Sequence, residues 1–229
     1  MSEVFAIKIQ SDPKLDNFEN LLQCVSSEKQ ARIKKFRMHE DALRALFGDL
    51  LVRYAICSRL KISNVEVVFK LNEYGKPSLE GFPYFHFNIS HSGEWVVCVT
   101  DSLPVGIDVE TIRQIDMGIA KRFFSKDEFA FINSKEICER VDYFFQFWTL
   151  KESYIKACGK GLSIPLDSFS IRMDEGGISV LDINDNTEWF FKQYGIGAGY
   201  KMAVCSRHDK FSNGIETVDT LQLSKFFNV

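Results

Sequence analysis

The chain has 229 residues, of which 45% are hydrophobic, and a formal net charge of −3 at pH 7. Its length suffices for one large domain or two small ones, and its charge argues against a general basic field that would bind nucleic acid. It has no apolar run long enough to span a bilayer, no signal peptide and no C-x-x-C pair among its six cysteines, so we expect a cytoplasmic protein without a membrane partner, zinc site or disulfide.

The N-terminal part predicts a strand followed by a basic helical segment. Residues 4–9 alternate as a strand, and Ser26 is an expected N-cap of the segment that follows. That segment holds five basic residues within nine positions: Lys29, Arg32, Lys34, Lys35 and Arg37. A solvated helix face explains any one of them, whereas the cluster as a whole is the strongest candidate anion site on the chain.

A long helix, a tight turn and a hairpin come next. Residues 39–60 form an amphipathic helical pattern, and Arg44 lies off its apolar stripe. Lys76 lies between a glycine and a proline in a turn that holds its backbone, although a solvated loop lysine is equally consistent with this position. His91 lies in the turn of a predicted hairpin, where its ring either faces solvent or donates a hydrogen bond to phosphate.

Residues 105–110 predict a strand in which acidic and apolar side chains alternate. Side chains two positions apart leave the same face of a strand, so Asp108 and Glu110 point the same way while Ile107 and Val109 point toward a core. Adjacent carboxylates repel each other unless a cation lies between them, and oxygen ligands suit Mg²⁺. The stretch is therefore either an exposed acidic strand edge or part of a metal site.

A helical segment at residues 145–157 supplies a third carboxylate. Glu152 and Lys156 are four positions apart and share one helix face. They form either a surface ion pair worth about 0.2–0.5 kcal/mol or a third metal ligand beside a lysine for phosphate. Three acids and a lysine suit a phosphoryl-transfer centre, because Mg²⁺ takes few protein carboxylates and completes its shell with waters and phosphate oxygens.

The second part of the chain predicts two helices and a series of strands. Ser125 and Glu128 form a capping box for a helix over residues 126–133, and Gly159 is the expected C-cap of the next helix. Further strands are expected at residues 163–172, 178–183, 189–194 and 200–206.

This order of elements predicts an α+β fold with two halves, each an antiparallel sheet with helices to one side. The halves would join near Pro104, as residues 1–104 and 105–229. The strand at 95–100 should lie antiparallel to the strand at 105–110. A ligand cleft at the joint would bring the basic residues of the first half close to the acids of the second.

Three motifs together resemble those of the Sfp-type 4′-phosphopantetheinyl transferases: Phe-Asn-Ile-Ser-His-Ser at 87–92, Gly-Ile-Asp-Val-Glu at 106–110 and Phe-Trp-Thr-Leu-Lys-Glu-Ser-Tyr-Ile-Lys at 147–156. The likeness continues through residues 73–77, 120–125, 159–163, 166–169 and 199–205, and it extends to about His208. No single motif is decisive, but their order and spacing together are highly specific.

The resemblance implies a pseudo-dimeric α+β fold with coenzyme A between the halves, within a monomeric chain. It implies Mg²⁺-dependent transfer of the phosphopantetheinyl arm to a serine of an acyl or peptidyl carrier protein, leaving 3′,5′-ADP. The carrier would serve fatty acid, polyketide or nonribosomal peptide synthesis.

Matched by position, the resemblance assigns residues to two sets. Asp108, Glu110 and Glu152 would hold Mg²⁺, with Glu152 also a candidate base for the serine proton and Lys156 a contact of the pyrophosphate. Around coenzyme A, the 3′-phosphate positions match Lys29, Arg32, Arg44 and His91, and other lining positions match Lys76 and Ser90. Arg32 is a basic match where the family pattern has a lysine.

Two other functions are compatible with the same residues. One is a Mg²⁺-dependent phosphohydrolase that acts on a nucleotide with water as nucleophile, and the other is a regulatory module that binds coenzyme A without catalysis. A carrier protein that gains one phosphopantetheinyl group only when coenzyme A and Mg²⁺ are present would separate all three.

A local basic patch is the candidate docking surface for an acidic carrier. Lys121, Arg122 and Lys126 flank the start of the helix capped by Ser125, and Lys151 could join them. The alternative is a solvated basic helix start.

Overall fold

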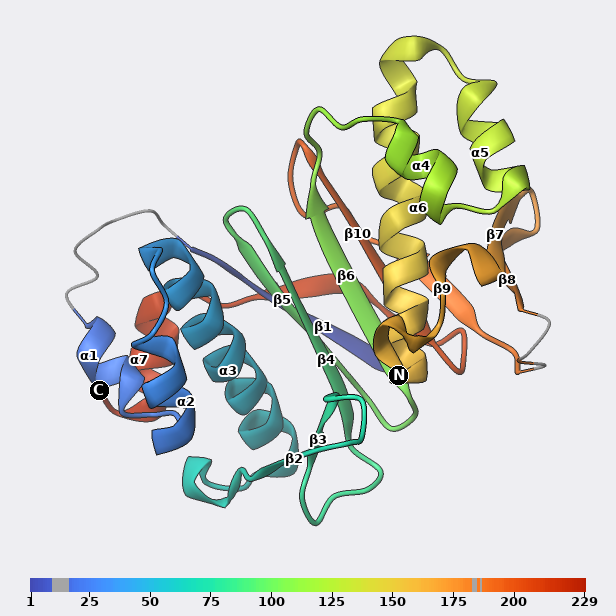
Figure 1. Cartoon of the computed structure of the whole chain (residues 1–229). Coiled ribbons are helices and arrows are strands. Elements are labelled where there is room, and N and C mark those ends of the chain that lie inside the picture. Colours follow the sequence, from blue (N-terminus) through green and yellow to red (C-terminus); the bar gives the residue numbers. More distant parts are fainter. Residues whose placement is uncertain (10–16, 183–184, 186) are drawn as a thin grey trace.

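Two β-sheets packed face to face form the centre of the protein, in a computed structural model that describes residues 1–9, 17–182, 185 and 187–229 (Figure 1). In this described part of the chain, one sheet has the strand order β11-β1-β5-β4 and the other the order β6-β10-β9. Their bounds are β1 Ser2–Lys8, β4 His86–Ser92, β5 Trp95–Asp101, β6 Val105–Thr111, β9 Phe190–Gln193, β10 Tyr200–Ser206 and β11 Phe211–Thr217. All neighbouring pairs are antiparallel except β1 with β11, and the expected α+β class with antiparallel sheets is confirmed.

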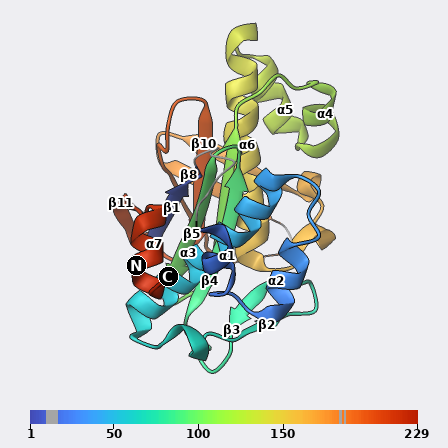
Figure 2. The same ribbon diagram turned by 90° about the vertical axis from the view of Figure 1, so that its left-hand side faces the viewer.

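Two long helices cover the outer faces of the sheets (Figure 1). Helix α3 (His39–Leu60), which begins and ends where the hydrophobic pattern predicts, packs on the first sheet. Helix α6 (Ile137–Cys158) packs on the second sheet. Figure 2 shows α4 (Gly118–Phe123) and α5 (Lys126–Asn133) projecting beyond the sheets beside one end of α6. No helix in the described ranges combines the length and apolar character needed to cross a bilayer.

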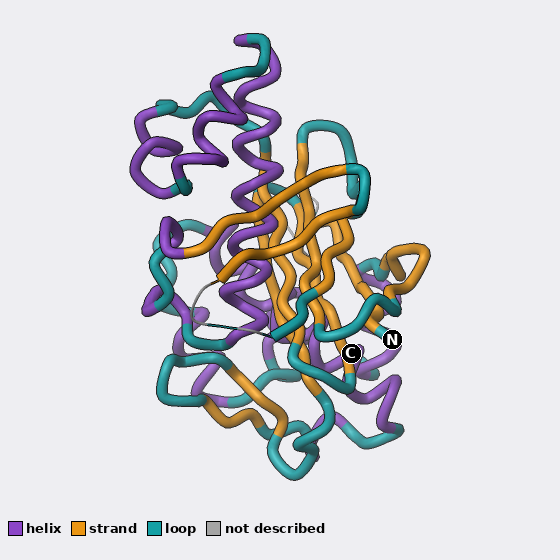
Figure 3. The backbone as a smooth tube through the Cα atoms, turned by 90° about the vertical axis from the view of Figure 1, so that its right-hand side faces the viewer, coloured by secondary structure: helices purple, strands orange, loops and turns teal. Residues whose placement is uncertain are grey.

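Smaller elements flank this four-layer arrangement. The hairpin of β7 and β8 lies on the outer side of α6 (Figure 3). The short helices α1, α2 and α7 lie beside α3, and β2 and β3 form a second hairpin. The bounds are β2 Phe69–Leu71, β3 Pro77–Leu79, β7 Phe169–Asp174, β8 Gly177–Asp182, α1 Phe18–Leu22, α2 Ser27–Ile33 and α7 Thr220–Phe227. Single 3₁₀ turns are η1 Asn64–Glu66, η2 Gly161–Ser163 and η3 Leu166–Ser168.

The local capping signals are confirmed. Ser26 accepts a hydrogen bond at the start of α2, and Ser125 with Glu128 forms a capping box on α5. Gly159 ends α6 in the left-handed conformation, with φ 73°, which costs glycine little. The expected strand at 163–172 is wrong over its first part, because two 3₁₀ turns precede β7; Pro165 there has no N–H to give to a sheet.

The edges of β4 and β6 meet through side chains. The expected pairing of residues 95–100 with 105–110 is wrong, because β6 pairs with β10 in the second sheet. Instead, β4 lies along β6 and presents oxygen atoms from every second residue. Asn88, Ser90 and Ser92 accept the N–H groups of Ile107, Val109 and Thr111 at 2.9, 3.4 and 3.0 Å, respectively. This ladder holds the two sheets in register where the candidate site lies.

The end of the chain returns to the first sheet. Strand β11 pairs in parallel with β1, and Leu223 of α7 is buried in the core beneath α3. The expected C-terminal half, residues 105–229, therefore does not include its own last strand and helix. The first half is completed by β11 and α7, because the outer edge of β1 is covered by residues from the far end of the chain.

A close approach places α6 against β6. A β-carbon at Gly106 would overlap backbone atoms of Ser153 and Ala157, so only glycine permits this spacing. The acids of β6 consequently lie beside Glu152, which is in the last two turns of α6.

Candidate active site

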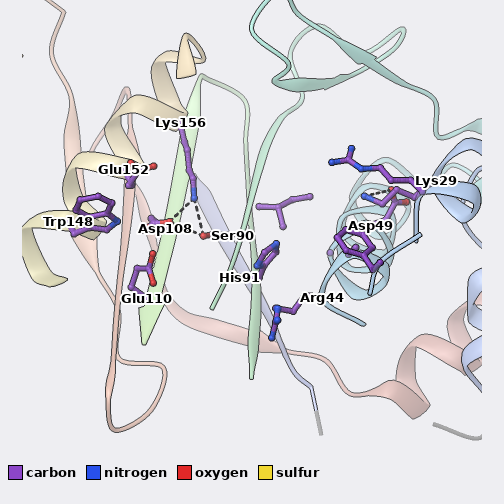
Figure 4. A pocket seen from close by; sticks show the side chains of 15 residues that line it. Lys29, Arg44, Asp49, Ser90, His91, Asp108, Glu110, Trp148, Glu152 and Lys156 are labelled. Carbon is purple, nitrogen blue, oxygen red and sulfur yellow. Dashed lines mark hydrogen bonds and ion pairs between the residues drawn. The ribbon is translucent and has the colours of Figure 1, made fainter. Parts of the chain in front are cut away.

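A cavity of about 530 Å³ lies between the two halves and gathers the expected site residues (Figure 4). Those that line it are Lys29, Arg32, Arg44, Ser90, His91, Asp108, Glu110, Glu152 and Lys156. Three acids come from β6 and α6, with Lys156 of α6 beside them, while the other basic side chains come from α2, α3 and β4, with Asp49 of α3 beside them. Figure 4 shows Asp108, Glu110, Glu152 and Lys156 on one side, and Lys29, Arg44 and Asp49 on the other. Residues far apart in the sequence thus form one surface with opposite charges on its two walls.

The acidic wall consists of three carboxylates that perturb one another. Burial raises the pKa of Glu152, and the neighbouring Asp108 and Glu110 raise it further, whereas Lys156 lowers it. Burial and Asp108 likewise raise the pKa of Glu110. Val109 between the acids points into the core, as its place in the strand predicts. The charges of Asp108 and Glu110 therefore act on Glu152, and the charge of Asp108 acts on Glu110.

Asp108 is the most deeply buried of the three acids, with 3% of its surface exposed. Its Oδ1 accepts hydrogen bonds from Lys156 Nζ at 2.6 Å and from Ser90 Oγ at 2.8 Å. Its Oδ2 is buried and has no hydrogen-bond partner among the described residues. Buried carboxylate oxygens are normally paired, so Oδ2 is an available ligand atom of a residue that lines the cavity.

Glu110 is oriented by two residues that sequence reasoning missed. Ser92 donates to Glu110 Oε2 at 3.0 Å, and Arg113 donates to the same oxygen at 3.3 Å. The signal was present for Ser92, because it lies two positions after Ser90 and so leaves the same face of β4. Each of these two serines accepts an N–H from β6 and donates to the acid that precedes that N–H.

Arg44 and His91 form the part of the basic wall next to the acids. Arg44 donates to the carbonyl of Gly93 at 3.2 Å and pairs with Asp41 at 2.5 Å. Burial lowers the pKa of His91, and the charges of Arg44 and Lys156 lower it further. The imidazole is thus surrounded by cations, an arrangement that an anionic ligand would relieve.

Lys29 and Arg32 of α2 form the far part of the basic wall. Lys29 lies 3.8 Å from Asp49, which Arg53 binds more closely at 2.5 Å. A second cavity of about 490 Å³ adjoins here and shares Lys29, Arg32 and Asp49 with the first. Its other walls are mainly apolar and include the loop beside β3, so a ligand with an anionic part and a flat apolar part could extend across both cavities.

Lys76 is not among the described residues that line the first cavity. Its ammonium donates to the backbone carbonyls of Lys156, Val105 and Ala157 at 2.6, 3.1 and 3.2 Å. Burial lowers its pKa to about 8. The structure therefore brings together every expected site residue except this one.

Lys151 cannot belong to a surface patch, and that expectation is corrected. Its side chain is fully buried and donates to both oxygens of Glu128, at 2.7 and 2.8 Å, and to the carbonyl of Phe169. Burial lowers the pKa of Lys151 while Glu128 opposes the shift. The pair fixes α5 and β7 to α6. Lys121, Arg122 and Lys126 are exposed.

The acidic wall fits a divalent cation by its chemistry. Three carboxylates on adjoining elements supply the oxygen ligands that Mg²⁺ prefers, and Asp108 Oδ2 is a buried acceptor that nothing described satisfies. As they stand, no three metal-ligating side chains of the described residues converge on one point. Lys156 binds Asp108, while Ser92 and Arg113 bind Glu110, so these partners fix the orientation of both acids.

Comparisons with known proteins agree with the motifs. The family model of the 4′-phosphopantetheinyl transferase N-terminal region matches residues 10–103, and that of the 4′-phosphopantetheinyl transferase superfamily matches residues 104–205. A Thermotoga maritima holo-[acyl-carrier-protein] synthase structure has 19% identity and a TM-score of 0.40, covering 45% of this chain and 61% of that chain.

Curated relatives match over most of the chain. The 4′-phosphopantetheinyl transferase Sfp of Bacillus subtilis (strain 168) is 41% identical over 222 residues, covering 96% of this chain and 99% of that protein. The 4′-phosphopantetheinyl transferase gsp of Aneurinibacillus migulanus is 38% identical, covering 100% of this chain and 95% of that protein. The mouse L-aminoadipate-semialdehyde dehydrogenase-phosphopantetheinyl transferase is 32% identical, covering 81% of this chain and 68% of that protein. This chain belongs to the 4′-phosphopantetheinyl transferase family.

Proposed function

We propose that this protein transfers the 4′-phosphopantetheinyl group of coenzyme A to a serine hydroxyl of an acyl or peptidyl carrier protein, with release of 3′,5′-ADP. The observation that carries this proposal is the single cavity in which a wall of three carboxylates faces a wall of basic side chains. That arrangement suits a ligand with a pyrophosphate at one end and a separate phosphate at the other. Family membership identifies such a ligand as coenzyme A.

The basic wall would bind the phosphates of coenzyme A. Lys29, Arg32, Arg44 and His91 are the proposed contacts of the 3′-phosphate, with Ser90 and Lys156 nearer the pyrophosphate. Charge-assisted hydrogen bonds from such groups contribute about 1.5–3 kcal/mol each. Because these side chains lie on α2, α3 and β4 of the first half and on α6 of the second, binding would also draw the two halves together around the ligand.

Asp108, Glu110 and Glu152 would hold Mg²⁺, and the unpartnered Asp108 Oδ2 supports this assignment. When bound, the ion supplies neutralisation of charge on the pyrophosphate. Ser92 and Arg113 keep Glu110 directed at the same wall. Lys156 neutralises Asp108 in the present arrangement and is placed to exchange that partner for a phosphate oxygen.

Glu152 is the proposed acceptor of the serine proton, directly or through one water. The serine Oγ would form a bond to the phosphorus that carries the pantetheine arm, and the bond from that phosphorus to the bridging oxygen would break. The electron pair leaves with 3′,5′-ADP, and the hydroxyl proton goes to Glu152. Burial and two neighbouring acids raise the pKa of this carboxyl, which makes its carboxylate a better base near neutral pH.

The two halves form a pseudo-dimer in this proposal. Each contributes one sheet and one long helix, α3 or α6, and the cavity lies where they meet. The halves differ at the end of the chain, because β11 and α7 pack with the first half. A second chain is not needed to complete the described cavity, so we propose that the protein acts as a monomer.

Mass spectrometry of an apo carrier protein tests the function. The mass should rise by one phosphopantetheinyl group only when the protein, coenzyme A and Mg²⁺ are all present. A nucleotide phosphohydrolase would degrade coenzyme A without a carrier, and a regulatory module would bind coenzyme A and change neither molecule. Either of these results would contradict the proposal.

A further inference from the structure

Lys76 and Asn72 join the loop of one half to the end of the long helix of the other. We propose that these two are positioning residues. They form a clamp that fastens the loop 72–77 to the C-terminal end of α6. The clamp sets the position of this loop, which lines the second cavity, relative to the α6 residues that line the first. This inference rests on the proposed function. It assigns Lys76 a role through the protein backbone and not through a bond to coenzyme A.

The first half of the clamp is the Lys76 ammonium. An ammonium has three donors, and all three have partners in the carbonyls of Val105, Lys156 and Ala157. All three partners are neutral, so within the described part of the chain the cation is held by backbone dipoles. Its pKa, although lowered by burial to about 8, leaves it mainly protonated at pH 7.

The second half of the clamp is Asn72. Its Oδ1 accepts the N–H groups of Tyr74 and Lys76 at 3.0 and 2.8 Å, which closes the loop on itself. Its Nδ2 donates to the carbonyl of Gly159 at 2.9 Å. One side chain therefore shapes the loop and fastens that loop to the residue that caps α6.

The end of α6 needs these partners. The last carbonyls of a helix have no intrahelical donors, and a cation there interacts favourably with the negative end of the helix dipole. In α6 the donors come from a loop about eighty residues earlier in the chain, as the separation of 80 between Lys76 and Lys156 shows. Loss of the ammonium would leave partly buried carbonyls unpaired, which is destabilising.

The clamp connects two surfaces that the proposed ligand would touch. On the helix side, Glu152 and Lys156 lie within the last two turns of α6 and line the first cavity. On the loop side, Gly75 and Pro77 line the second cavity with Lys29 and Arg32. A shift of the loop against α6 changes the spacing of these surfaces, and misplacement by 1 Å can cost up to about 10²-fold in rate.

Chemical rescue of Lys76→Ala tests the clamp in the full-length protein. The substitution removes three methylenes and the ammonium, which together correspond to n-propylammonium. We expect Lys76→Ala to lower the melting temperature of the ligand-free protein and to raise KM for coenzyme A at least about tenfold, with a smaller change in kcat. Added n-propylammonium should reverse both effects, whereas tetramethylammonium, which has no N–H donor, should not at equal ionic strength.

The matched control is Lys70→Ala in the neighbouring strand. Lys70 is exposed and pairs with Glu80 at 2.7 Å. Its loss should leave the melting temperature and KM for coenzyme A unchanged, and n-propylammonium should act on this variant as it acts on the wild type. If Lys76→Ala does not fold, the milder Asn72→Asp, which keeps the acceptor and loses the donor, should raise KM in the same direction.

Three results would overturn the proposal. An unchanged melting temperature with a raised KM would make Lys76 a direct contact of coenzyme A. A lowered melting temperature with unchanged KM would leave a helix cap without a positioning role, and failure of n-propylammonium to act differently from tetramethylammonium would exclude the carbonyl site. Coenzyme A affinity measured by calorimetry replaces KM if the wild type modifies no carrier, so failure of the clamp and failure of the proposed function are distinguished.

Discussion

Lys156 and Asp108 form an ion pair of 2.6 Å that uses only one of the two carboxylate oxygens. The lysine compensates a buried charge that would otherwise be costly, while the other oxygen is buried and has no hydrogen-bond partner among the described residues. A phosphate would compete for Lys156 and a cation would compete for Asp108. Simultaneous arrival of both would separate the pair without leaving either charge uncompensated, so we expect the metal and the phosphate to bind with mutual reinforcement.

Asp108→Asn should abolish transfer and preserve the fold. The amide can still accept from Ser90 and Lys156, but it is a poor ligand for Mg²⁺. The loss should exceed the 10–100-fold that removal of a group behind a metal ligand typically costs. Thermal unfolding checks the reason: Mg²⁺ should raise the melting temperature of the wild type and not that of the variant. Near-normal turnover in saturating Mg²⁺ would show that the three-carboxylate site is wrong.

Ser92→Ala should weaken divalent-ion binding by roughly 10–100-fold, because Glu110 loses the hydroxyl that orients it. Ser92→Thr keeps the hydroxyl and is the matched control. Electron paramagnetic resonance of added Mn²⁺ measures the affinity without relying on turnover. Equal Mn²⁺ affinities for the alanine variant and the wild type would remove Glu110 from the metal site.

Arg44→Ala should weaken binding of coenzyme A more than binding of dephospho-coenzyme A. The difference should approach the 1.5–3 kcal/mol of a charge-assisted hydrogen bond, measured by calorimetry with both ligands. Arg37→Ala is a suitable control, since Arg37 is exposed and belongs to the same basic cluster without lining the described cavity. Equal losses for the two ligands would take Arg44 away from the 3′-phosphate.

Binding of coenzyme A should take up a proton at His91. Burial and the charges of Arg44 and Lys156 hold its pKa below 6.5, whereas Asp41 raises it slightly. A bound phosphate favours the imidazolium and raises this pKa. Affinity should therefore increase as pH falls from the His91 pKa of the complex to that of the free protein. Calorimetry near pH 6.5–7 in two buffers with different ionisation enthalpies measures the uptake. If His91→Gln shows the same uptake as the wild type, the proton goes elsewhere.

Charge reversal at Lys121 and Lys126 tests the carrier surface. Both side chains are exposed on α4 and α5, which project from the body of the protein (Figure 2). The double glutamate variant should raise KM for the carrier and leave KM for coenzyme A unchanged, because rim charges mainly affect encounter. Salt should reduce the effect, with screening over about 8 Å at physiological ionic strength. An unchanged carrier KM at low salt would place docking elsewhere.

Local patterns were enough to predict helix α3, the later turns of α6 and the caps at Ser26, Ser125 and Gly159, whereas α6 begins at Ile137, eight residues before the predicted helical segment. The alternation at Asp108 and Glu110 and the helical spacing of Glu152 and Lys156 depend only on residues near in sequence, and family motifs related these to the basic cluster. The role of Lys76 was not visible in this way. Its partners are carbonyls, which every residue carries, so no side-chain pattern marks them.

Pairings between distant segments were also beyond local patterns. Strand periodicity does not indicate which strands are neighbours. We expected β6 to lie antiparallel beside β5, whereas in the structure side chains of β4 bind the backbone of β6. The contact of Gly106 with α6 could have been suspected, since glycine in a strand often marks close approach of another backbone. A single glycine does not indicate which segment of the chain approaches it.

The parallel pairing of β1 with β11 has a consequence for how the protein is made. Strand β1 is synthesised long before β11, so its outer edge stays uncovered until β11 has been made. Until then β1 presents unpaired backbone groups of the kind that recruit other strands, and incomplete chains are prone to aggregate for this reason. A nascent or prematurely terminated chain that lacks residues 211–217 is therefore expected to depend on chaperones far more than the finished protein does.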